Sequence, residues 1–110
     1  MSDDIDSRAV WDDVLAQGVL GKVILVGLTY LSVDGKVIEQ QQFYGSVLSV
    51  HPRKGILLSL GGQRAGEQYN LPPDTRSIEI ASPGEYRLRA TDEVVVDPDY
   101  MITFSVSKQA

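Results

Sequence analysis

The sequence contains no cysteine and a single histidine, His51. Without cysteine there is no disulfide framework, no thiolate nucleophile and no zinc site with sulfur ligands. One histidine cannot supply the imidazole-rich metal sites that take the place of sulfur sites. We therefore expect neither a metal nor any other cofactor.

A long apolar run is also missing. The longest nearly apolar stretch, Val23 to Leu31, includes Gly27 and Thr29 and is far shorter than the ~20 residues that span a bilayer as a helix. Residues 1–6 form an acidic leader. A signal peptide instead begins with basic residues followed by an apolar stretch. The prediction is a cytoplasmic protein with no membrane segment.

Excess charge of one sign is confined to the start of the chain. The net charge is −5 over 110 residues, and the five aspartates and one arginine within residues 1–13 contribute −4 of it. The rest is close to neutral, so no general field attracts nucleic acid or anionic lipid. The length fits a single domain, residues 1–110, with one hydrophobic core.

One amphipathic helix is predicted over residues 7–17. Asp6 or Ser7 is placed to cap its start, and Gly18 to follow its end. Its apolar positions recur at three- and four-residue spacing: Val10, Trp11, Val14 and Leu15.

From residue 22 to residue 107 the pattern changes to the period-two alternation of β-strands. A strand over 22–33 is apolar on both faces, which indicates a central position with cover on each side. Asp34-Gly35 predicts a type I′ turn into an antiparallel strand over 36–50. Gly45 within that strand indicates a bend or bulge of the kind that helps a small sheet to close. The expected fold is mainly β, a small antiparallel barrel of six or seven strands with one N-terminal helix.

The first half of the chain, about residues 7–60, resembles the SH3-like and Sm-like small barrels. The resemblance rests on the helix followed by alternating Val23, Leu25 and Gly27, and on Phe43-Tyr44-Gly45-Ser46-Val47. An Sm-like fold implies nucleic-acid binding. However, the Asp-x-x-Asn pattern and the Arg-Gly pair of that family are missing here, so no RNA-contacting residue is carried over. The second half, from Leu71-Pro72-Pro73-Asp74 to Arg89, resembles a small bacterial family that implies no activity.

Two segments are predicted to bind a partner. The glycine-rich segment Gly61–Asn70 lacks the Gly-Lys-Ser/Thr of a phosphate-binding loop. It is interpreted either as a plain connection or as an exposed binding loop, with contacts from Gln63, Arg64 and Tyr69.

The stretch Glu39–Gln42 is polar on both faces inside a strand, so it must protrude or lie at a sheet edge. Gln40 and Gln42 are its predicted contact residues. A free edge accepts another strand through backbone hydrogen bonds, in β-augmentation or self-association. An edge that is merely protected, with no partner, is the competing interpretation.

Other chemistry is less well supported by the sequence. Arg53 is a further predicted binding residue, and a continuous patch of Arg53, Lys54 and Arg64 would favour nucleic acid. The acidic loop that holds Asp92, Glu93, Asp97 and Asp99 would need shifted pKa values to act in catalysis, and it lacks the spacing of an EF-hand.

We therefore predict a protein that is not an enzyme. It is a protein-interaction module that binds a protein partner or itself through an exposed strand edge and the Gly61–Asn70 loop. The alternative is an Sm-like nucleic-acid-binding protein, and an enzyme that uses the acidic loop is a third hypothesis.

Overall fold

A computed structural model describes residues 10–107, and most of them lie in β-strands, with one short α-helix. The mainly β prediction is confirmed. The elements in chain order are α2 (Asp13–Gly18), β1 (Val23–Leu31), β2 (Val37–His51), β3 (Gly55–Leu60), the 3-10 turn η1 (Gly62–Arg64), β4 (Gln68–Leu71), β5 (Ile78–Ile80), β6 (Glu85–Arg87), β7 (Val94–Val96) and β8 (Tyr100–Ser107).

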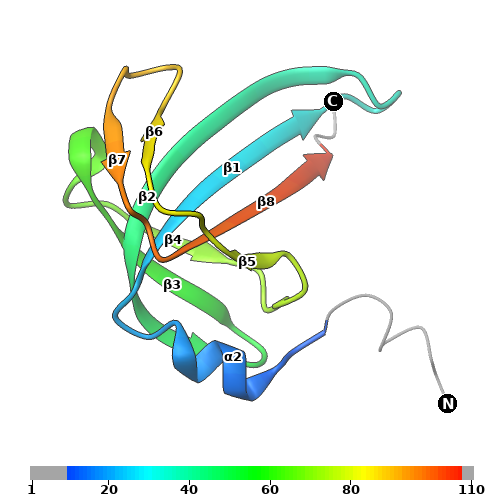
Figure 1. Cartoon of the computed structure of the whole chain (residues 1–110). Coiled ribbons are helices and arrows are strands. Elements are labelled where there is room, and N and C mark those ends of the chain that lie inside the picture. The colour runs from blue at the N-terminus through cyan, green and yellow to red at the C-terminus, as the bar shows by residue number, and fades with distance from the viewer. Residues whose placement is uncertain (1–9, 108–110) are drawn as a thin grey trace, which may run out of the picture.

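Six of the strands form one curved sheet in the order β4-β3-β2-β1-β8-β5, and β6 and β7 form a separate hairpin beside it (Figure 1). Over residues 10–107 the outer strands β4 and β5 do not pair with each other, so the sheet is not closed into the predicted barrel. Eight strands are described where six or seven were predicted. The predicted antiparallel order also fails at one place, since β1 and β8 run parallel. Alternation in the sequence identifies strands but not their direction, which explains the error.

Strand β2 belongs to both halves of the sheet. Its first part pairs with β1, and from Gly45 onward it pairs with β3. Gly45 itself stands opposite both Ile24 and Leu60, and a Cβ at this position would lie 2.6 Å from the backbone oxygen of Ser59. A bend or bulge was predicted at Gly45, but no register shift lies there; the glycine instead allows a close approach of the two backbones. The register shifts of β2 lie at Ile38, opposite Tyr30 and Leu31, and between Val47 and Ser49.

The hairpin between β1 and β2 forms as predicted, but its turn is longer than a type I′ turn. The loop covers residues 32–36, with Ser32 donating its N–H to the Lys36 carbonyl at 2.8 Å. Only Gly35 has a positive φ (88°) in this loop, whereas type I′ requires two such residues. The ladder beside this loop has a register shift between Tyr30 and Leu31, where Ile38 of β2 has no partner on β1.

The main core lies on one face of the curved sheet, and β1 contributes Ile24, Val26 and Leu28 to it. The opposite face of β1 carries Leu25, which packs with Leu88 and Val95 of the β6–β7 hairpin. Both faces of β1 are thus covered around Leu25, as its apolar sequence predicted. The other buried members of the main core are Val19, Phe43, Val47, Ile56, Leu58, Leu60, Leu71, Ile78 and Ile102.

The N-terminal helix is shorter than predicted. Residues 10–12 are not helical, and α2 begins at Asp13 with the Asp12 carboxylate accepting the N–H of Leu15 at 3.2 Å. Gly18 is the last helical residue rather than the one after it. Val14, predicted on the apolar face, is 84% exposed. The predicted caps at residues 6 and 7 lie outside the described residues.

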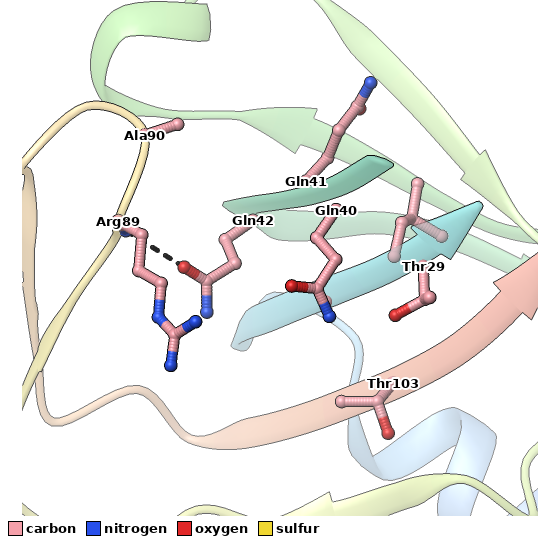
Figure 2. A pocket seen from close by; sticks show the side chains of 9 residues that line it. Thr29, Gln40, Gln41, Gln42, Arg89, Ala90 and Thr103 are labelled. Atoms are coloured by element: carbon pink, nitrogen blue, oxygen red, sulfur yellow. Dashed lines mark hydrogen bonds between the residues drawn. The ribbon is translucent and has the colours of Figure 1, made fainter. Parts of the chain in front are cut away.

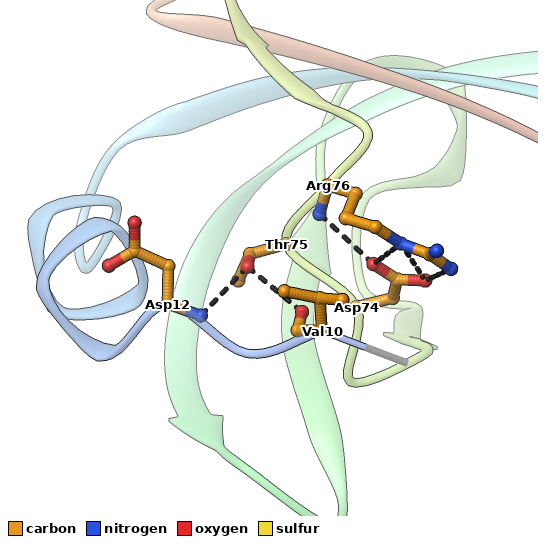
Figure 3. Close-up of polar contacts among 5 residues, drawn as sticks. All are labelled: Val10, Asp12, Asp74, Thr75 and Arg76. Atoms are coloured by element: carbon orange, nitrogen blue, oxygen red, sulfur yellow. Dashed lines mark hydrogen bonds and ion pairs between the residues drawn. The ribbon is translucent and has the colours of Figure 1, made fainter. Parts of the chain in front are cut away.

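A buried threonine explains why residues 10–12 are extended (Figure 3). The Thr75 hydroxyl donates to the carbonyl of Val10 at 3.0 Å and accepts the N–H of Asp12 at 2.9 Å. The Thr75 backbone N–H donates to the same Val10 carbonyl at 2.8 Å. These bonds fix the segment against the chain before β5, and a helix through residues 10–12 would break them.

Beside this threonine, the Asp74 carboxylate pairs with the Arg76 guanidinium at 2.6 Å (Figure 3). The hydrogen bond from Arg76 lowers the pKa of Asp74, and partial burial opposes that effect. A lowered pKa in the folded state means that the contact stabilises the fold above the unfolded pKa. The contribution is lost as the pH falls through the folded pKa.

Replacing Thr75 by valine should lower the free energy of unfolding by about 1–2 kcal/mol, because the N–H of Asp12 loses its acceptor in a partly buried site. Urea unfolding followed by circular dichroism measures the change. Thr75→Ser keeps the hydroxyl and is the matched control. Equal destabilisation by valine and serine would show that the methyl group, rather than the hydrogen bonds, matters at this position.

Candidate functional site

The first part of β2 is a free sheet edge. Between Val37 and Gln42 this strand pairs with β1 on one side, and no other strand of the described chain pairs with it on the other. Its side chains are largely exposed, including Val37 at 60% and Ile38 at 54%. The predicted contact residues Gln40 and Gln42 lie on this edge, as part of a hairpin that extends beyond the core (Figure 1).

The backbone of Gln40 and Gln42 points outward from this edge. In an antiparallel ladder, successive residues direct their N–H and C=O groups alternately toward the partner strand and away from it. Val47 donates its N–H to the carbonyl of Lys22, the residue before β1, at 3.0 Å, while the Tyr44 carbonyl accepts from Gly61 on the opposite side. Even-numbered residues from Tyr44 back to Gln40 therefore present their backbone groups to the free side.

A groove adjoins the edge on the sheet face opposite the main core. It has a volume of about 450 Å³, and its floor is formed by β1 at Gly27 and Thr29, with Thr103 of β8 beside them. Figure 2 shows the side chains of Gln40 and Gln42 pointing into this space. The groove is thus built from three neighbouring strands.

Arg89, in the loop between β6 and β7, forms one wall of the groove (Figure 2). Its backbone N–H donates to the side-chain oxygen of Gln42 at 3.0 Å, which ties the loop to β2. The sequence reasoning missed Arg89, Thr29 and Thr103 as site residues. A glycine in the middle of the apolar β1, Gly27, was the available signal, because it leaves space above the sheet.

The predicted binding loop Gly61–Asn70 is held by internal contacts. Glu93 accepts the N–H of Gln63 at 2.8 Å. The guanidinium of Arg64 bonds to Glu67 at 3.0 Å and lies 4.8 Å from the centre of the Phe43 ring. The side chain of Arg64 therefore has partners within the fold, and its role in binding stays a prediction.

Tyr69, the third residue predicted in that loop, lies in β4 on the sheet itself. Its ring is 5.0 Å from that of Phe43 and packs against the main core. Burial raises the pKa of its phenol, with a further contribution from Tyr30. The position of Tyr69 thus fits a packing role.

The basic residues do not form the continuous patch that would favour nucleic acid. Arg53 and Lys54 lie in the turn before β3, where both backbone N–H groups donate to Nδ1 of His51 at 3.1 and 3.2 Å. Arg64 follows the other end of β3, a six-residue strand about 20 Å long. The cations are therefore separated by the length of this strand.

The acidic residues near β7 contact backbone groups or an arginine side chain of the fold. Asp97 accepts the N–H of Gly84 at 2.7 Å, and Asp99 accepts the N–H of Val23 at 2.9 Å. Asp92 pairs with Arg87 at 3.5 Å. In residues 10–107 no cluster of three or more histidine or acidic side chains is arranged to hold a metal ion. Asp97 and Asp99 thus hold loop segments in place through backbone hydrogen bonds.

Comparison with known protein families, characterised proteins and solved structures finds no match to this chain. Function is therefore inferred from the edge and the groove. No helix within residues 10–107 has the length and apolar character needed to cross a membrane.

Proposed function

We propose that the protein is a non-catalytic protein-interaction module that acts through the free edge of β2. The observation that carries this proposal is the stretch Val37–Gln42, which pairs on one side only and presents outward-pointing backbone groups at Gln40 and Gln42. Natural edges are usually protected by charged side chains, especially lysine, by proline, by a β-bulge or by a covering element. This stretch has neither lysine nor proline; its one charged residue is Glu39, and a register shift leaves Ile38 without a partner on β1. Such an edge is suited to accepting another strand.

The occupant that fits this edge best is the same strand of a second copy. An antiparallel pairing centred on Gln40 places the outward-pointing Gln40 residues of the two copies opposite each other. Gln42 of one copy then lies opposite Ile38 of the other, where β2 has its register shift. The same pairing also places Glu39 opposite Gln41, so the two Glu39 carboxylates do not face each other directly. Within one chain Gln41 already donates to Glu39 at 2.9 Å. Charge and backbone direction are both compatible with this two-fold pairing.

A second free edge, on β8, would allow a different assembly. Strand β5 pairs with β8 only as far as Ile102, so Thr103–Ser107 also lacks an outer partner among the described residues. Pairing of a β2 edge with a β8 edge would be head-to-tail and would form either a closed ring of several copies or an open series of oligomers. Pairing of two β2 edges instead gives a closed dimer.

Light scattering over about 10–1000 µM protein tests the proposal, since a short strand interface is expected to be weak. We expect a concentration-dependent dimer. Gln40→Pro should abolish it, because proline removes the outward N–H and is tolerated on edge strands. Gln40→Ala is the control, since it loses the side chain but keeps that N–H. A monomer at every concentration, an open series of oligomers, or a dimer unaffected by proline would overturn the proposal.

We also propose that the fold belongs with the SH3-like and Sm-like small domains. Two features support this: the 15-residue β2 strand shared by both halves of the sheet, and the close backbone approach at Gly45. The nucleic-acid function of Sm-like proteins is not part of the proposal, because Arg53, Lys54 and Arg64 do not form one patch.

A further inference from the structure

The groove beside the β2 edge has a chemistry that strand pairing does not use. Strand pairing engages backbone groups at the edge, whereas the groove is lined by side chains on one face of the sheet. Its lining residues are Gly27, Leu28, Thr29, Gln40, Gln41, Gln42, Arg89, Ala90 and Thr103. One cation and no carboxylate are found among them.

The Arg89 guanidinium is available to a ligand. Arg64, Arg76 and Arg87 each form an ion pair within the chain. Arg89 forms none with any residue between 10 and 107, and its hydrogen bond to Gln42 uses the backbone N–H instead. Figure 2 shows its side chain extending beside that of Gln42 toward the groove. A positive fork of N–H donors with no internal acceptor suits an oxyanion.

The rest of the groove offers neutral hydrogen-bonding groups. Gln40 and Gln42 each carry an amide that both donates and accepts, and Thr29 and Thr103 are hydroxyl residues on the floor. Gly27 keeps this floor open, because a Cβ there would already lie 3.3 Å from Thr103 Cγ2. The volume of about 450 Å³ is within the range of small-ligand sites.

We propose that this groove binds a carboxylate attached to a neutral, hydrogen-bonding body. Arg89 receives the carboxylate, and the glutamine and threonine side chains bond to hydroxyl or amide groups of the body. A small hydroxylated acid and the carboxyl terminus of a peptide both have this chemistry. The binding uses side chains on the sheet face, whereas strand pairing uses backbone groups at the edge.

Two pairs of probes distinguish these sources. Glucuronate is compared with neutral glucose, and N-acetylated triserine with a free carboxyl terminus is compared with its amidated form. Each is titrated into ¹⁵N-labelled protein, and the NMR signals of the Gln40 and Gln42 side-chain amides and of the Thr29 and Thr103 backbone are followed. We expect saturable shifts with one charged probe and much weaker shifts with its neutral match.

Arg89→Gln should weaken that binding at least about tenfold, because it removes a charge-assisted hydrogen bond. The matched control is Arg87→Gln, two residues earlier, since Arg87 lies outside the groove lining and pairs with Asp92. Neither variant should change the oligomeric state, so failure here is distinguishable from failure of edge pairing. No saturable shift with either acid up to about 10 mM, or binding unaffected by Arg89→Gln, would overturn the inference.

Discussion

Replacing Gly45 by alanine is expected to destabilise the protein by about 3 kcal/mol, at the upper end of the usual cost of overpacking. The added Cβ would lie 2.6 Å from the backbone oxygen of Ser59 and 3.1 Å from Cδ2 of Leu60. Because the nearest atom is backbone, relief requires β2 and β3 to move apart where β2 passes from one half of the sheet to the other. Chemical denaturation measures the loss as a lower urea midpoint.

Gly18→Ala is the control for this prediction. Gly18 lies in α2, and a Cβ added there would have no other group within 4 Å, so alanine should stabilise the helix by up to about 1 kcal/mol. Opposite signs for the two glycine substitutions are expected. A Gly45→Ala variant as stable as the wild type would mean that β2 and β3 do not approach as closely as described.

Leu88→Ala is the second substitution with a large expected effect, also about 3 kcal/mol. Leu88 is 1% exposed and joins Leu25 and Val95 in the small core that attaches the β6–β7 hairpin to the main sheet. Removing its side chain leaves a cavity at the point where the hairpin is held. Thermal unfolding gives the stability, and amide exchange in β6 and β7 shows whether the hairpin opens before the rest.

Val96→Ala is the matched control, because Val96 lies in the same hairpin but is 62% exposed. It should change the free energy of unfolding by less than about 0.5 kcal/mol. Similar losses for Leu88 and Val96 would contradict the assignment of Leu88 to a core. Loosening of the hairpin would also release Arg89 from Gln42, so Leu88→Ala should weaken ligand binding in the groove.

Local features of the fold could be predicted from the sequence because they depend on neighbouring residues. The apolar pattern of β1 and the polar stretch after Ile38 identified a central strand and a protruding strand. The hairpin between them followed from Asp34-Gly35, although the turn type did not. The start of α2 could not be predicted, because Thr75, which is distant in the sequence, holds Val10 and Asp12 in an extended segment.

The groove was beyond sequence reasoning for the same reason. It requires that β8 return parallel to β1, which places Thr103 beside Gly27, and that the β6–β7 hairpin fold over Leu25. Arg64 remains a predicted binding residue because of its position in a glycine-rich segment. The sequence did not indicate its ion pair with Glu67 or its position over the Phe43 ring.

Edge pairing is tested most directly by backbone amide exchange of Gln40, Gln41 and Gln42, measured by NMR at low and high protein concentration. If β2 edges pair, the outward N–H groups of Gln40 and Gln42 gain protection as the concentration rises, while Gln41, bonded toward β1, changes little. Exchange at Gln40 and Gln42 that stays fast at every concentration would contradict the proposed interaction through this edge.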